Sequence, residues 1–134
     1  MHRSRIGVVL LDFPSDTHDA AQQFWAGAVG HEAESEDGDP DYALLGRLGT
    51  VKLFTQRTGF GTPARVHLDI ETDDVAAEVA RLLALGAAVE AAHNHFTVLR
   101  DPGGIVFCVV PVQTGDDFAP NATTWPQRSR AGVI

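Results

Sequence analysis

Apolar and polar residues alternate without a break from position 65 to 71, where the chain reads Arg-Val-His-Leu-Asp-Ile-Glu. Successive side chains of a β-strand point to opposite faces, so this pattern predicts a strand with one apolar and one polar face. The polar face carries Arg65, His67, Asp69 and Glu71. Apolar residues then recur at helical spacing, which predicts a helix capped by Asp73 or Asp74 and ended by Gly86.

The same order of elements is predicted twice along the chain. The first half has a strand at 6–11, a helix that opens at Ser15 or Asp16 and ends at Gly30, and then three strands. Those strands are predicted at 31–36, 42–45 and 50–55. The second half repeats this order, with three strands after its helix at 87–91, 96–100 and 105–110.

This repeat predicts an α+β fold made of two tandem βαβββ modules. We place the modules at residues 5–57 and 64–112, inside one domain that covers residues 1–112. Two curved sheets side by side would form a mixed sheet around a cleft. In the first helix, Phe24 and Trp25 lie on the apolar stripe that is expected to pack against the sheet.

Residues 113–134 form a C-terminal tail without clear periodicity. One interpretation is that Phe118 and Trp125 anchor the tail on the domain surface or on a partner subunit. The other is a partly ordered terminus.

Charge and composition exclude several classes of function. The 134 residues include 10 Lys and Arg against 18 Asp and Glu, a formal net charge of −8. Binding to nucleic acid needs a basic face, so we expect no nucleic-acid partner. A negative field favours a cationic ligand, although it also serves solubility. No apolar run reaches the length of a membrane span, and the single cysteine, Cys108, favours a cytoplasmic location.

Residues 6–111 resemble the vicinal oxygen chelate superfamily, which includes glyoxalases, bleomycin-resistance proteins and extradiol dioxygenases. The matching pieces are residues 66–70, 85–87, 98–104 with the Asp-Pro-Gly-Gly turn, and 107–110. The His-Leu-Asp strand and the Phe-Cys-Val ending resemble, more closely, glyoxalase-like proteins of actinobacterial type. The resemblance implies paired modules, a ligand in the cleft and a homodimer.

The resemblance also identifies candidate site residues. Metalloenzymes of the superfamily carry one metal ligand on each of four strands, and these positions fall on Val9 (within one residue), Leu53, His67 and Cys108. One imidazole and one thiol are too few for a stable divalent site, so we expect no metal and no cofactor. A weakly held divalent metal is the alternative. The implied ligand-binding residues are His67, Asp69, Leu53, Phe96, Val98 and Cys108.

Two chemical roles stay open for the polar pair on the 65–71 strand. His67 and Asp69 either anchor a ligand or act as an acid–base pair in which the carboxylate orients the imidazole, or they form a structural hydrogen-bond network. Cys108 lies on an apolar strand, where packing as a small hydrophobe is the more usual role. His93 and His95 fall at a hairpin or loop and give only a weak metal signal.

We therefore expect a glyoxalase- or bleomycin-resistance-like protein that binds a small organic ligand without a metal. The alternative is a lyase or isomerase of the glyoxalase type that uses His67 and Asp69 as its acid–base pair. A third interpretation is a structural dimer whose cleft is closed by the tail.

Overall fold

A computed structural model describes residues 1–126, which form two compact units. One unit contains residues 6–69, and the other contains residues 1–5 together with the chain from residue 70 onward. Strands β1 (His2–Pro14) and β5 (Arg65–Thr72) each contribute residues to both units. No helix in the described part of the chain is long and apolar enough to span a membrane.

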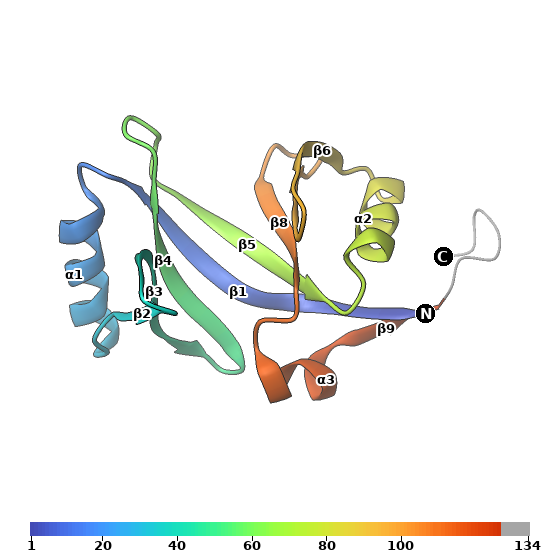
Figure 1. Ribbon diagram of the computed structural model, residues 1–134, viewed down its shortest axis with the longest axis horizontal. Coiled ribbons are helices and arrows are strands. Elements are labelled where there is room, and N and C mark those ends of the chain that lie inside the picture. Colours follow the sequence, from blue (N-terminus) through green and yellow to red (C-terminus); the bar gives the residue numbers. More distant parts are fainter. Residues whose placement is uncertain (127–134) are drawn as a thin grey trace. The chain divides into compact units, whose positions relative to one another are not determined.

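The first unit contains one βαβββ module (Figure 1). After β1 come α1 (His18–Val29), β2 (Glu34–Glu36), β3 (Asp39–Leu48) and β4 (Val51–Thr58). Strand β4 lies between β3, to which it is antiparallel, and β1, to which it is parallel. A return to a parallel neighbour needs a long connection, and α1 with β2 and β3 supplies it.

The register of β1 against β4 decides which side chains share a face. Leu11 lies opposite Thr55, and the Thr55 hydroxyl donates to Oε1 of Gln22 in α1 at 2.5 Å. This face of the sheet is therefore the one that α1 covers. The alternate residues point to the other face, where Leu10 lies opposite Phe54 and both are buried.

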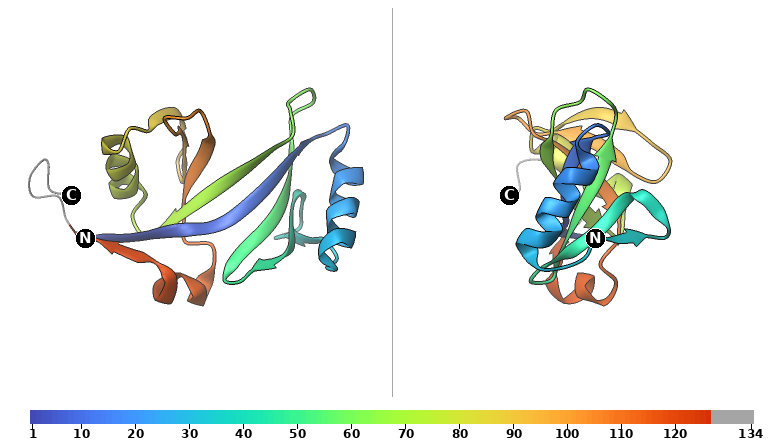
Figure 2. Two further views of the ribbon diagram at one scale, coloured as in Figure 1. Left: turned by 180° about the vertical axis from the view of Figure 1, so that it is seen from behind. Right: turned by 90° about the vertical axis from the view of Figure 1, so that its left-hand side faces the viewer.

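The second unit repeats the βαβββ order. After β5 come α2 (Val75–Ala84), β6 (Ala88–Ala92), β7 (Thr97–Arg100) and β8 (Val106–Pro111). Strand β7 is antiparallel to both β6 and β8, and α2 packs against β8. The view from behind in Figure 2 shows α2 beside these strands. The predicted α+β fold, a mixed sheet with two βαβββ modules, is confirmed.

The helix ends show why local sequence predicted the helices well. The side chain of Asp74 accepts a hydrogen bond from the Ala77 N–H at 3.0 Å, as an N-cap residue does. Gly30 ends α1 with a φ of +75°, a left-handed conformation that favours glycine. The start of α1 differs from the prediction, because Ser15 donates to the Thr58 carbonyl and the helix begins only at His18.

Three other expectations about the first unit were wrong. β1 begins at His2 rather than at position 6, because its first residues pair with a strand from the tail. β3 runs from Asp39 to Leu48 and is longer than the predicted strand 42–45, since its pairing with β4 continues up to Leu48. Phe24 is 66% exposed and Trp25 is 38% exposed, so neither forms the expected helix–sheet core.

Residues 113–126 of the tail pack on the unit to which they belong. They form a 3-10 turn (Gly115–Asp117), α3 (Phe118–Asn121) and β9 (Thr123–Trp125). β9 pairs antiparallel with the N-terminal end of β1, and the two strands run side by side in Figures 1 and 2. Phe118 is buried, so anchoring on the domain is the interpretation that holds for these residues. The rest of the predicted tail, 127–134, lies outside the described residues.

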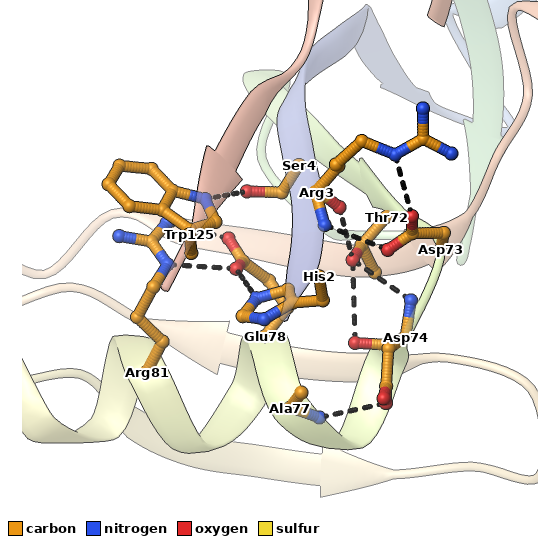
Figure 3. A network of polar contacts seen from close by, with 10 residues as sticks. All are labelled: His2, Arg3, Ser4, Thr72, Asp73, Asp74, Ala77, Glu78, Arg81 and Trp125. Carbon is orange, nitrogen blue, oxygen red and sulfur yellow. Dashed lines mark hydrogen bonds and ion pairs between the residues drawn. The ribbon is translucent and has the colours of Figure 1, made fainter. Parts of the chain in front are cut away.

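A polar network holds β9 in place (Figure 3). Glu78 of α2 is fully buried and accepts two hydrogen bonds from Arg81, at 2.9 and 2.7 Å, while His2 Nε2 lies 2.7 Å from its carboxylate. Arg81 in turn lies over the Trp125 ring, 3.7 Å from its centroid, and the indole N–H donates to Ser4. The ion pair thus positions the cation on which the tail's aromatic ring rests.

A second buried carboxylate, Glu71 of β5, connects three segments of the same unit. Its oxygens accept from Arg5 Nε at 2.7 Å, from the Thr114 hydroxyl at 2.6 Å, and from the backbone N–H groups of Gln113 and Thr114. Both oxygens are therefore satisfied, which is the condition under which a buried charge is tolerated.

We expect Glu71→Gln to lower the free energy of unfolding by about 3 kcal/mol, because it leaves the Arg5 cation buried without its anion. Glu90→Gln is the matched control. Glu90 accepts from Arg100 Nε at 2.6 Å, but its side chain is 39% exposed whereas that of Glu71 is 0% exposed. An exposed pair contributes at most about 1 kcal/mol. Urea unfolding measures both; equal losses would contradict this assignment.

The same pair predicts a pH dependence. Burial raises the pKa of Glu71, but hydrogen bonds from Thr114, Arg5 and the Gln113 N–H outweigh it and hold the pKa below its ordinary 4.5. A lowered folded-state pKa stabilises the fold above pH 4.5, and this contribution is lost as the pH falls through the folded value. The stability difference between wild type and Glu71→Gln should therefore narrow below pH 4.5. A difference that is constant with pH would argue against it.

Candidate functional site

Three ionisable side chains lie in a row in the unit of residues 6–69. His67 of β5 has its Nδ1 2.7 Å from Oδ2 of Asp12 in β1 and its Nε2 3.3 Å from Oδ1 of Asp69. All three are at least 94% buried, with exposed fractions of 6%, 1% and 5% in that order. The sequence predicted the pairing of His67 with Asp69, and the structure adds Asp12 on the other side of the ring.

The shorter contact assigns the orienting role to Asp12 rather than to Asp69. A carboxylate only accepts hydrogen bonds, so Nδ1 of His67 carries the proton that it donates to Asp12. A neutral ring then presents Nε2 as an acceptor beside Asp69, and a protonated ring donates to both carboxylates. The arrangement can hold or pass a proton at Nε2.

One carboxylate oxygen of Asp12 lacks a hydrogen-bond partner among the described residues. Its Oδ2 accepts from His67 and from Arg65 Nε at 3.1 Å, while its buried Oδ1 has no hydrogen-bond partner among the described residues. Buried polar atoms are paired in most proteins, and an unpaired carboxylate oxygen is unfavourable. Such an atom makes Asp12 a candidate for a functional role.

Asp12 was not among the predicted site residues, although the sequence contained a signal for it. It follows the apolar run 6–11 and keeps the strand's alternation with Val8 and Leu10. An acidic residue in phase with core residues predicts a charge on a buried face. Its partner His67 could not be identified from spacing, because the two lie 55 positions apart.

Aromatic side chains extend the site across the same face. Asp12 lies opposite Gln56 in β4, and Gln56 lies opposite Tyr42 in β3. The Tyr42 ring stacks on Phe54 with centroids 4.3 Å apart and planes 16° from parallel. The face opposite α1 therefore offers a carboxylate, an amide and a flat aromatic surface in adjacent strands.

Leu53 does not belong to this face. It lies opposite Val9, and Val9 is three positions from Asp12 in a strand with unbroken register. Odd separations place side chains on opposite faces, so Leu53 points to the α1 side with Thr55. Its neighbour Phe54, like Gln56, lies on the face of β4 that Asp12 and His67 share.

The remaining predicted site residues lie in the other unit. Val98 and Cys108 face each other across β7 and β8, on the face that alternates with buried Leu99 and Phe107. Phe96 precedes β7, is 36% exposed and stacks on His93 at 4.5 Å. Val98 and Cys108 thus form one apolar patch, and His93 uses its ring for an aromatic contact.

A four-ligand metal site of the superfamily's pattern does not fit this chain. Two of the four positions carry the hydrocarbon side chains Val9 and Leu53, which cannot bind a metal ion. Both also lie on the face opposite His67. Both nitrogens of the imidazole are within 3.3 Å of carboxylate oxygens. No step of a mechanism is therefore assigned to a metal.

Comparison with known proteins agrees with the fold. The family model described as a glyoxalase-like domain matches residues 8–110. A search of curated proteins gives no match.

Several solved structures share the fold at low identity. One from Legionella pneumophila, described as an NAD-dependent benzaldehyde dehydrogenase, is 9% identical with a TM-score of 0.58, over 79% of this chain and 98% of that one. A Streptomyces coelicolor methylmalonyl-CoA epimerase variant is 17% identical with a TM-score of 0.53, over 80% and 96%. A glyoxalase/bleomycin resistance protein/dioxygenase superfamily member from Vibrio splendidus is 16% identical with a TM-score of 0.51, over 84% and 100%.

The row of buried charges predicts a stability effect. His67→Ala should lower the free energy of unfolding by about 3–5 kcal/mol, because it removes the imidazole N–H that donates to the buried carboxylate of Asp12. His31→Ala is the control, since that imidazole makes an exposed hydrogen-bond contact with the Glu32 carbonyl and its loss should change stability by less than about 1 kcal/mol. Denaturant unfolding of both variants decides the matter, and an unchanged midpoint for His67→Ala would refute the arrangement.

Proposed function

Since the chain belongs to the glyoxalase-like domain family of the vicinal oxygen chelate superfamily, we propose that it binds a small organic ligand without a metal. The observation that supports this most directly is the buried row Asp12–His67–Asp69 beside the stacked Tyr42 and Phe54. Ligand sites combine an apolar wall with a few polar groups that fix orientation. A role of Phe96, Val98 and Cys108 in ligand binding stays a prediction from the sequence.

A lyase or isomerase is the second candidate, and one contact favours it. The 2.7 Å contact between Asp12 and His67 fixes the ring so that Nε2 faces away from Asp12. A carboxylate that holds one imidazole nitrogen leaves the other to accept or donate a proton during a reaction. The substrate in this case would be a carbonyl compound or an epoxide.

We further propose a cytoplasmic homodimer. Exposed Phe24 and Trp25 on α1, in edge-to-face contact at 5.3 Å, support a self-association surface because aromatic residues are enriched at the centres of interfaces. The closer similarity to actinobacterial proteins is likewise a prediction.

We expect Asp69→Asn to weaken ligand binding about tenfold while the melting temperature changes little. The Asp69 carboxylate would accept a charge-assisted hydrogen bond from the ligand, whereas its contact with His67, at 3.3 Å, is longer than the 2.7 Å contact between Asp12 and His67. Native mass spectrometry of the untagged protein identifies the subunit number and any retained small molecule. A thermal-shift screen of small organic compounds then supplies ligands for titration, with Asp16→Asn, an exposed aspartate, as control.

Two outcomes would contradict this proposal. A large loss of stability in Asp69→Asn with unaltered ligand affinity would reduce the row of charges to a structural network. Product formation from an aldehyde or epoxide, lost in His67→Ala and retained in Asp16→Asn, would replace the binding protein with the lyase.

A further inference from the structure

The oxygen of Asp12 that lacks a hydrogen-bond partner restricts the kind of ligand that can bind beside it. Oδ1 is buried and has no hydrogen-bond partner in the described part of the chain, so it can accept a hydrogen bond that the chain itself does not supply. An ionised carboxylate has no proton to donate. The group that completes this site must therefore present N–H or O–H donors, and a cationic donor forms the stronger bond.

Asp12 already has a guanidinium against its other oxygen. Arg65 Nε lies 3.1 Å from Oδ2, and its side chain is 50% exposed while that of Asp12 is 1% exposed. A half-exposed arginine can turn into solvent without disturbing packed neighbours. Movement of Arg65 would open a path to a carboxylate whose geometry suits a planar cation.

Charge balance favours the same kind of ligand. Asp12 and Asp69 flank one imidazole, and Arg65 supplies the cation beside them. A cationic ligand that takes the place of Arg65 keeps this balance. An anionic ligand would bring a third negative charge to a buried site, which is strongly unfavourable.

The aromatic surface lies at a suitable distance. Tyr42 and Asp12 are two strands apart, with Gln56 between them, so their Cα atoms are separated by about 10 Å. A ring attached to a planar cation can reach from the carboxylate towards the half-buried Tyr42 ring, which offers stacking and cation–π contacts and itself rests on the buried Phe54.

We propose that the ligand of this site carries a planar amidinium or guanidinium on a flat ring, and that Asp12 is the residue that selects it. This inference rests on the proposed binding function and adds the chemical class of the ligand. Asp12 Oδ1 and Oδ2 accept two parallel N–H bonds from the cation, Arg65 moves aside, and Tyr42 contacts the ring.

Three probes of equal size test the proposal by calorimetric or NMR titration: benzamidinium, neutral benzamide and anionic benzoate. Wild type should bind benzamidinium at least tenfold more tightly than benzamide, and benzoate least. Asp12→Asn should weaken benzamidinium binding about tenfold or more and leave benzamide nearly unchanged, because only the charge-assisted bond is lost. Tyr42→Leu should weaken both by a similar factor.

Arg65→Met keeps the test independent of the stability of Asp12→Asn. It removes an exposed competitor for Asp12 and should tighten benzamidinium binding severalfold, and it should not tighten benzoate binding because the site loses a positive charge. Asp16→Asn is the control for a general loss of negative charge.

The outcomes separate this inference from the proposed function. Equal affinity for all three probes, or a retained neutral or anionic compound whose binding depends on Asp69, would overturn the selection by Asp12 and leave the binding function intact. Absence of any bound compound and of any probe binding would overturn both.

Discussion

The strict alternation of side chains along β1 is the constraint on which the rest of this structure depends. Its register against β4 is unbroken from Val8 to Pro14, so each of these residues is committed to one face. Leu11 faces α1 with Thr55, while Leu10 packs with Phe54 on the other side. A slip of one position would turn every side chain of β1 to the other face. Asp12 would then face α1, and Leu10 would leave the core that it forms with Phe54. The same alternation brings Asp12 to His67 and keeps Leu53 away from it.

Local sequence signals determined the elements that local chemistry stabilises. The helix cap at Asp74 and the left-handed Gly30 follow from hydrogen bonds within a few residues, and both were predictable. The start of α1 was not, because Ser15 bonds to Thr58, which is 43 positions away. The N-terminal extension of β1 depends in the same way on a partner, β9, that only the folded chain supplies.

The candidate site shows the same difference between what local sequence predicts and what depends on contacts distant in sequence. His67 and Asp69 lie two residues apart on one strand, so alternation alone placed them on one face. Asp12 and its contact with His67 arise from strands that are distant in sequence, and no periodicity reveals them. The exposure of Phe24 and Trp25 shows another limit of prediction from sequence. An apolar stripe indicates which residues share a helix face, but it does not indicate what covers that face.

The pairing of β9 with residues 2–4 of β1 has a consequence for the order of folding. Trp125 donates to Ser4 across 121 positions, and β9 pairs with residues 2–4. During synthesis β1 therefore emerges long before β9, the strand with which residues 2–4 pair, has been made. Contacts of such large sequence separation form slowly, since the chain entropy of closure precedes the gain. Residues 2–4 are therefore made well before β9 and are among the last to find their place.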